Sequence, residues 1–245
     1  MSETFVLVHG AWHGAWCWAA VISQLEKLGD RAYAVDLPGH GMNHADRSKV
    51  TLDSYVNSVV DFIERHDLNN VVLAGHSLGG LTIPGVAVKI PKRIKRVVWV
   101  TATVALDGKP AVDPDDPRTA PLREIALARP DRSLPIEAMG EDFLSGLTSD
   151  MAPAVREYMM SALCPQPLGP MTGVVPMNAY FATGVPSSYL VCEKDAVPTE
   201  GGAGWHPHFS SRLRNPTLKF IDCGHEVMFT APTQCARALH ELATD

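Results

Sequence analysis

Residues 75–79 restrict the fold more than any other segment, because they join two patterns of opposite kind. They read Gly-His-Ser-Leu-Gly and follow Val71 to Ala74, an apolar run typical of a strand that is covered on both faces. A helical pattern follows. A chain that turns sharply from strand to helix leaves no room for side chains two positions either side of the bend, so Gly75 and Gly79 are needed there. The segment predicts a strand, a tight turn and a helix, with Ser77 strained at the bend.

Similar apolar runs recur along the chain, and helical patterns fill most of the gaps between them. The predicted strands are Phe5 to His9, Arg31 to Asp36, Val71 to Gly75, Arg96 to Thr101, Ser188 to Cys192 and Leu218 to Cys223. Helices are expected from Trp18 to Leu28, after a Thr51 cap, after Ser77, and from about Thr233 to the C-terminus. This alternation predicts an α/β fold with a doubly wound, mostly parallel sheet. A length of 245 residues suits one domain.

One region interrupts the rhythm. From Asp107 to Val185 the chain is dense in proline and contains no clear strand, while Leu122 to Ala128 and Ala154 to Leu163 look helical. A structureless loop of this length is improbable inside a compact domain, and its many apolar residues argue against a disordered linker. We expect a mostly helical cap at 107–185, laid over a core of residues 1–106 and 186–245. A separate domain is the alternative.

Composition and charge exclude several classes of partner. The formal net charge of −6 argues against nucleic acid and anionic membranes. No segment approaches the ~20 apolar residues of a membrane helix, and the N-terminus has no basic stretch of the signal-peptide kind. The five cysteines are scattered and form no Cys-x-x-Cys pair, which is typical of buried thiols in a reducing compartment. We therefore expect a cytoplasmic protein with no membrane partner.

The serine of this turn has the setting of a nucleophile. The strain holds the hydroxyl of Ser77 above the carboxyl edge of the sheet, and the helix that begins at Leu78 points its N–H groups and its positive end to the same place. The backbone N–H of Leu78 can then stabilise an oxyanion. The five-residue pattern occurs by chance in many proteins, but with a strand before it and a helix after it the pattern is specific.

A second loop is expected beside this serine. Residues 9–14, His-Gly-Ala-Trp-His-Gly, follow the first strand, and Gly10 allows the loop to approach the nucleophile closely. The N–H of Ala11 is the expected second oxyanion donor. Gly10, Trp12, His13 and His76 are the candidates for contact with substrate. A structural or pocket-lining role suits His9 and His13 better than a catalytic one, and the turn around His40 needs no catalytic explanation.

Serine also requires a base and a residue that orients it. His225 follows the last strand, at the edge where Ser77 lies, and imidazole has a suitable pKa. Asp195, on the turn after the preceding strand, is the expected acid, with Glu193 and Asp107 as alternatives. A His-Pro-His pair, His206 and His208, hints at a metal, but no third ligand accompanies it. We expect no metal and no cofactor.

These segments together resemble one branch of the α/β-hydrolase superfamily. The branch contains plant methylesterases, polyneuridine aldehyde esterase, hydroxynitrile lyases and bacterial esterase relatives. The matching residues are 5–16, the turn at 75–80, the turn at 192–195, and Gly224 with His225. The order serine, acid, histidine along the chain is also that of the superfamily. The resemblance covers both ends of the chain and only loosely the cap. It implies the α/β-hydrolase fold and a Ser-His-Asp triad.

Two departures bear on the chemistry. The lyases of this branch carry threonine where this chain has Gly10, and lysine where it has Glu226, which would repel a departing cyanide. The plant esterases commonly carry methionine at the position of Glu226, so their particular substrates are not transferable. We expect hydrolysis of small to medium apolar esters through an acyl-enzyme. The alternatives are a cofactor-independent hydroxynitrile lyase and a ligand-binding receptor on the same fold. A homodimer is an open hypothesis.

Overall fold

The computed structural model describes residues 2–113, 115–199, 202 and 204–244, and within them a six-stranded sheet forms the centre. Its strands are β1 (Thr4–Val8), β2 (Arg31–Val35), β3 (Val71–Ser77), β4 (Ile94–Ala102), β7 (Ser187–Cys192) and β8 (Thr217–Ile221). Their spatial order is β2-β1-β3-β4-β7-β8, and every neighbouring pair is parallel. All six predicted strands are confirmed, and all their carboxyl ends meet at one edge.

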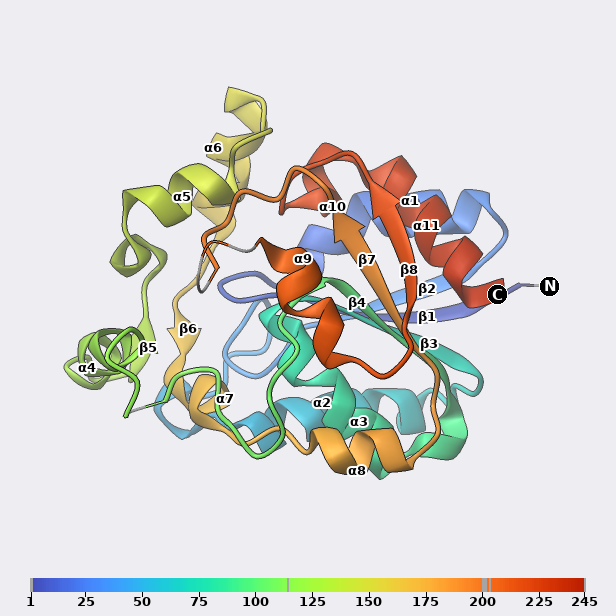
Figure 1. Ribbon diagram of the computed structural model, residues 1–245, viewed down its shortest axis with the longest axis horizontal. Helices are drawn as coiled ribbons and strands as arrows, with labels where there is room; N and C mark the ends of the chain where they lie inside the picture. The colour runs from blue at the N-terminus through green and yellow to red at the C-terminus, as the bar shows by residue number, and fades with distance from the viewer. Residues whose placement is uncertain (1, 114, 200–201, 203, 245) are drawn as a thin grey trace.

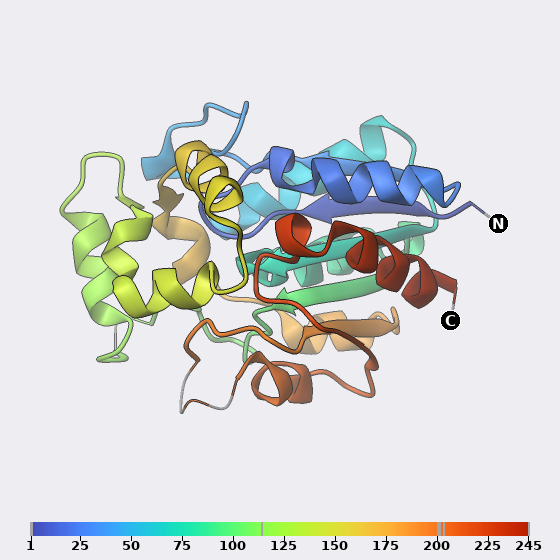
Figure 2. The same cartoon turned by 90° about the horizontal axis from the view of Figure 1, so that it is seen from above.

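Helices cover both faces of this sheet (Figures 1 and 2). The main ones are α1 (Ala19–Lys27), α2 (Leu52–Arg65), α3 (Ile83–Lys89), α8 (Met177–Ala182) and α11 (Pro232–Thr244), with the shorter α9 (Trp205–His208) and α10 (Val227–Thr230). α1 and α11 lie on one face, and α2, α3 and α8 lie on the other. None of the helices in the described ranges combines the length and the apolar composition needed to cross a membrane. The doubly wound arrangement expected from the sequence is confirmed.

Successive strand residues divide between two cores. Val6 and Leu73 pack into the cluster beneath α2, α3 and α8, whereas Phe5 and Val72 pack into the cluster beneath α1 and α11. Side chains alternate across a strand, so a strand buried on both faces must be apolar at every position. This is the physical reason for the continuous apolar runs.

The start of α2 follows the expected capping pattern. The side chain of Thr51 accepts a hydrogen bond from the N–H of Ser54 at 3.1 Å, and the Ser54 hydroxyl accepts one from the N–H of Thr51 at 2.9 Å. Two backbone donors that the helix leaves unpaired are thereby satisfied. The helix then buries one face, including Tyr55, Val59 and Ile63, against the sheet.

The proline-rich region is largely helical and lies beyond the carboxyl ends of the strands (Figure 2). It contains α4 (Ala120–Leu127), α5 (Glu141–Leu147), α6 (Pro153–Ala162) and α7 (Leu168–Thr172). The region also contains a short antiparallel ladder between Ser133–Leu134 (β5) and Gln166–Pro167 (β6), which the sequence did not indicate. Two-residue strands have no periodicity that a sequence could display.

The last helix of the region expected to be cap belongs to a different layer. Met177 and Tyr180 of α8 pack in the core cluster beneath the sheet, next to α3, and not with α4 to α7. Tyr180 also donates a hydrogen bond to the carbonyl of Val185, at 3.3 Å, just before β7. The boundaries at residues 107 and 185 stay a prediction, but the packing of α8 is that of a core helix.

Candidate active site

The turn at the carboxyl end of β3 has the conformation that its glycines predict. Ser77 has φ +49° and ψ −121°, which is strained for a residue with a side chain. A Cβ on Gly75 would lie 3.0 Å from the carbonyl carbon of Gly79, and one on Gly79 would lie 2.7 Å from the carbonyl oxygen of His9. Larger residues at either position would force the turn open. The turn gives way directly to a 3-10 turn, η3 (Leu78–Leu81), and then to α3.

The loop after β1 touches this turn. A Cβ on Gly10 would lie 2.9 Å from the Cβ of Ser77, so a larger residue here would displace one of the two loops. Within the described part of the chain, the N–H groups of Ala11 and Leu78 donate no hydrogen bond to another protein group. Two free backbone donors therefore flank the serine, one from each of the two loops, as an oxyanion would require.

His225 and Asp195 form a buried pair. Nδ1 of His225 lies 2.7 Å from Oδ2 of Asp195, and the two side chains are 1% and 2% exposed. Burial alone would lower the pKa of His225, but the charge and hydrogen bond of Asp195 hold this pKa above its ordinary value. Asp195 fixes Nδ1 as the protonated nitrogen, which leaves Nε2 free to take a proton.

The other two candidate acids lie elsewhere. The side chain of Glu193 is exposed. Asp107 accepts hydrogen bonds from the backbone and side-chain N–H groups of Asn178, at 2.8 and 2.7 Å, at the exposed start of α8. Of the three carboxylates considered from the sequence, the structure brings only Asp195 to the imidazole.

A residue that the sequence analysis did not single out also contacts this acid. The hydroxyl of Thr101 donates to Oδ2 of Asp195 at 2.5 Å. The register between β3 and β4 shifts at this point, so that Thr101 has no partner on β3 and adopts φ +35°. Such a bulge redirects a side chain at the end of a strand. The only sequence signal was a threonine ending an apolar run at the carboxyl edge.

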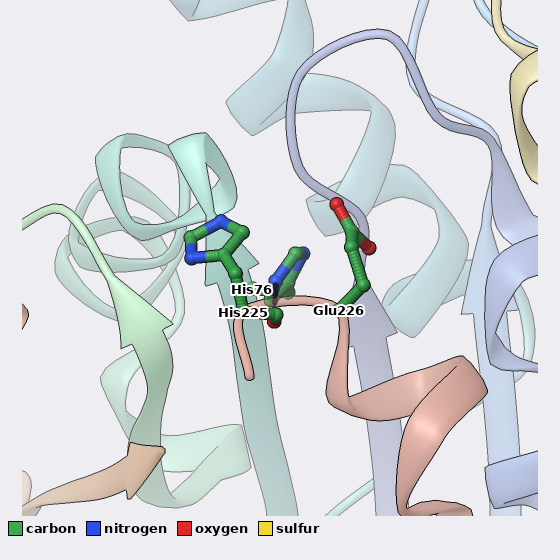
Figure 3. A group of neighbouring side chains, drawn as sticks. All are labelled: His76, His225 and Glu226. Atoms are coloured by element: carbon green, nitrogen blue, oxygen red, sulfur yellow. Dashed lines mark hydrogen bonds between the residues drawn. The ribbon is translucent and has the colours of Figure 1, made fainter. Parts of the chain in front are cut away.

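The loop after β8, which carries His225, is hydrogen-bonded to β3, the strand that ends in Ser77. Nε2 of His76 donates to the carbonyl oxygen of His225 at 3.0 Å, and the two rings lie 4.9 Å apart between centroids. Figure 3 shows His225 and His76 side by side. From the cap, Asp150 accepts a hydrogen bond from the N–H of Gly224 at 2.6 Å. The loop of His225 thus lies at the same edge of the sheet as Ser77. Nothing in the sequence around Asp150 indicated its contribution.

Three buried histidines hold the loop after β1. Nδ1 of His9 donates to the carbonyl of Gly10 at 2.8 Å, Nδ1 of His13 to that of Ala11 at 2.8 Å, and Nδ1 of His40 to that of His13 at 2.7 Å. Burial lowers the pKa of His9 to about 4 and that of His13 to about 3, and it lowers the pKa of His40 as well. These rings are neutral donors at physiological pH.

The side chains considered for substrate contact are mostly engaged in structure. The indole N–H of Trp12 donates to the carbonyl of Leu134 in the cap at 2.9 Å, and this side chain is buried. His13 and His76 are 2% and 0% exposed. Gly10 lies directly against Ser77. The substrate-binding roles stay predictions, and for the two histidines the contacts are those of loop supports.

One group of side chains in the described ranges is close enough to hold an ion. The ligand atoms of His76, His225 and Glu226 lie within 4.8 Å of one another. Because Nδ1 of His225 is bonded to Asp195, an ion there would use Nε2 and compete with the serine for it. The His-Pro-His pair that hinted at a metal in the sequence is engaged in hydrogen bonds. His206 contacts Ser210 at 2.6 Å, and His208 contacts Arg212 at 2.9 Å.

Comparisons with known proteins agree with this geometry. The model of the alpha/beta hydrolase family matches residues 5–238. Methylesterase 7 of Arabidopsis thaliana is 28% identical over 99% of this chain and 96% of its own length. A carbendazim hydrolyzing esterase of Nocardioides sp. (strain SG-4G) is 28% identical over 97% and 98%. An extracellular alpha/beta-hydrolase from a Paenibacillus species is 29% identical, with a TM-score of 0.89 over 99% of this chain and all of that one. By its fold, its strained serine turn and these matches, the chain belongs to the alpha/beta hydrolase family.

Proposed function

We propose that this protein hydrolyses carboxylic esters, with Ser77 as the nucleophile, His225 as its base and Asp195 as the acid that orients the base. The observation that carries the proposal is the buried His225–Asp195 pair, 2.7 Å apart, whose loop is hydrogen-bonded to His76, the residue before the strained serine. The similarity to Methylesterase 7 and to the carbendazim hydrolyzing esterase supports ester chemistry.

The reaction has two steps. The hydroxyl of Ser77 attacks the ester carbonyl while Nε2 of His225 takes its proton, and the N–H groups of Ala11 and Leu78 stabilise the oxyanion. The imidazolium returns that proton to the departing alcohol, which leaves an acyl group on Ser77. Water then attacks the acyl-enzyme by the same sequence and releases the acid. Asp195 stabilises the imidazolium in both steps.

The expected substrates are small to medium and apolar. Ala11 and Trp12, of the loop after β1, pack in an apolar cluster with Leu147 and Met159 of the cap. Val197, after β7, belongs to the same cluster. An acyl or alcohol group that enters beneath this cap meets few polar partners, so an apolar group loses least on leaving water. A panel of nitrophenyl esters of increasing acyl length tests this, and a preference for charged acyl groups would contradict it.

The function itself is tested by labelling and by kinetics. A fluorophosphonate is expected to add one adduct mass to Ser77, and a short nitrophenyl ester is expected to give a burst of nitrophenol. The matched control is Ser77→Ala, which leaves the fold intact and takes no label. Rapid cyanide release from mandelonitrile without ester turnover would show that the enzyme is a lyase and not an esterase. Slow turnover with tightly retained product would indicate a receptor.

We also propose a cytoplasmic location. The five cysteines are all free thiols, and four of them are buried, as expected in a reducing compartment. Fractionation of cells that express the native gene tests this, because recovery of the protein outside the cell would refute it. A homodimer stays a prediction, and light scattering on the purified protein measures it directly.

A further inference from the structure

Five buried polar atoms in and around the loop after β1 (residues 9–14) have no hydrogen-bond partner among the described residues. They are both carboxylate oxygens of Glu226, Nε2 of His13, Nδ1 of His76 and the indole nitrogen of Trp18. Unpaired buried polar atoms are rare, and a group of them requires an explanation. The cluster contacts the loop whose Ala11 N–H is the proposed oxyanion donor through His13, which is bonded to the carbonyl of Ala11.

The positions of the protons in this cluster follow from the neighbouring bonds. Nδ1 of His13 must carry a hydrogen because it bonds to a carbonyl oxygen, so Nε2 of the neutral ring is a bare acceptor. Nε2 of His76 likewise donates to the carbonyl of His225, which leaves Nδ1 bare. An ionised Glu226 would add only acceptors to a cluster whose single donor is the indole of Trp18. With Glu226 ionised, the cluster would contain four acceptor atoms and one donor.

Glu226 is the residue placed to supply one. Its Oε2 lies 3.4 Å from Nε2 of His13, and the two side chains are 1% and 2% exposed. Figure 3 shows the side chains of Glu226 and His225, although adjacent in the chain, diverging from the loop that joins them, with His76 between them. The contact of His225 with Asp195 is made through Nδ1, whereas Glu226 contacts His13.

We propose that Glu226 is a positioning residue that acts as a neutral carboxylic acid: it donates its proton to Nε2 of His13 and thereby keeps the Nδ1 hydrogen of His13 on the carbonyl of Ala11. The proposal rests on the proposed ester hydrolysis, because the loop it stabilises is the one that carries the oxyanion donor. No role for Glu226 follows from the triad alone.

The charges around Glu226 agree with a neutral acid. Burial raises its pKa to about 7, the charge of His225 opposes this, and Asp195 and Asp150 add to it. Cys17 and His76 also face it, and burial keeps the pKa of that thiol high and of that imidazole low. Because burial lowers the pKa of His13 to about 3, the shared proton belongs on Glu226 and not on the ring.

Loss of this proton would change the tautomer of His13. An ionised Glu226 attracts the ring hydrogen to Nε2, and the bare Nδ1 then faces the carbonyl of Ala11, acceptor against acceptor. The Ala11 segment would have to move, and the oxyanion donor would move with it. We therefore expect kcat to fall as Glu226 ionises near pH 7, with little change in KM, because an oxyanion donor acts in the transition state.

The kinetic test compares Glu226→Gln with Glu226→Leu. The amide N–H of glutamine can replace the acid as donor to His13 and does not titrate, so this variant should keep the kcat of the unaltered enzyme at pH 6 and lose its alkaline decline. Leucine removes the donor, and kcat should fall on the order of 10–10²-fold, below the cost of losing an oxyanion donor outright. If Glu226→Gln is as impaired as Glu226→Leu, the ionised form is the active one and the proposal is wrong.

A spectroscopic test is independent of turnover and of the leucine variant folding. The infrared carbonyl band of a protonated carboxylic acid should be present at pH 6, fade near pH 7 and be missing in Glu226→Gln. Nitrogen chemical shifts should report the Nδ1-protonated tautomer of His13 in the unaltered enzyme. Glu64→Gln, which alters an exposed carboxyl on α2, is the matched control and should keep the band. A missing band at pH 6 refutes the neutral acid even if no ester is ever turned over.

Discussion

The two loops that meet at Ser77 are stabilised by different chemistry. The loop after β8 is held by carboxylates, since Asp195 binds the ring of His225 and Asp150 binds the N–H of Gly224. The loop after β1 is held by neutral imidazoles that donate to its carbonyl oxygens. In the proposed reaction, the first loop stabilises a positive charge that appears on the imidazole, whereas the second only keeps a peptide dipole in place. Changes to the first loop should alter pH dependence, and changes to the second should alter kcat alone.

The largest expected effect of a change in these two loops comes from the acid. Asp195→Asn keeps the shape of the side chain but cannot stabilise the imidazolium, so kcat should fall by ~10⁴. The acid limb of the kcat/KM profile should move to lower pH, because the charge and hydrogen bond of Asp195, which raise the pKa of His225, are gone. Retained activity would transfer the role to Glu193 or Asp107.

A smaller effect is expected from the β1 loop. His9→Ala removes the donor to the Gly10 carbonyl, and that carbonyl belongs to the same peptide as the Ala11 N–H. We expect kcat to fall by up to ~10²-fold with KM nearly unchanged and the pH profile in its original place. His9→Asn, whose amide can occupy the position of Nδ1, is the matched control and should restore most of the rate. A shifted pH profile in His9→Ala would contradict the division between the loops.

A still smaller effect is expected from Thr101, whose hydroxyl donates a hydrogen bond to Asp195. Thr101→Val keeps the shape and loses the hydroxyl that donates to Asp195, so the carboxylate keeps its bonds to His225 and to the N–H of Val197. We expect a loss of kcat of about tenfold, which corresponds to one hydrogen bond to a charged group. Thr101→Ser should recover it. An unchanged rate in Thr101→Val would mean that the remaining bonds alone orient the acid.

The smallest effect concerns stability. Between the ordinary value of 4.5 and about 7, folded Glu226 holds a proton that the unfolded chain has released. The folded state binds more protons in this window, so this group makes stability fall as pH rises through it, and the loss is complete above pH 7. Glu226→Gln should therefore raise the melting temperature more at pH 8 than at pH 5. An equal shift at both values would mean that Glu226 titrates normally.

The sequence was sufficient where a local rule governs. The turn at Ser77 followed from two glycines between a strand and a helix, and the meeting of His225 with Asp195 followed from the strands they succeed. Their catalytic roles stay predictions. The relation to methylesterases was also visible, in the segments at both ends of the chain, and the comparisons confirm it. In each case a few neighbouring residues determine the outcome.

The parts that were missed depend on contacts between distant segments. Thr101 reaches Asp195 only because of a register shift between two strands, which neither strand records in its own sequence. Asp150 comes from the cap, whose position cannot be derived from its composition. The role of the buried histidines depends on which carbonyl each ring meets after folding. Glu226 stood out in sequence only as a departure from its relatives.

Two hydrogen bonds of Trp12 connect the loop after β1 to the cap. Its indole donates to the carbonyl of Leu134 in β5, and its own carbonyl accepts from the N–H of Cys164 at the end of α6, at 2.9 Å in both cases. Trp12 directly follows Ala11 and has φ +63°. Trp12 therefore holds the adjoining Ala11 N–H in register with two separate segments of the cap, and the placement of this donor depends on the packing of the cap as well as on the loop itself.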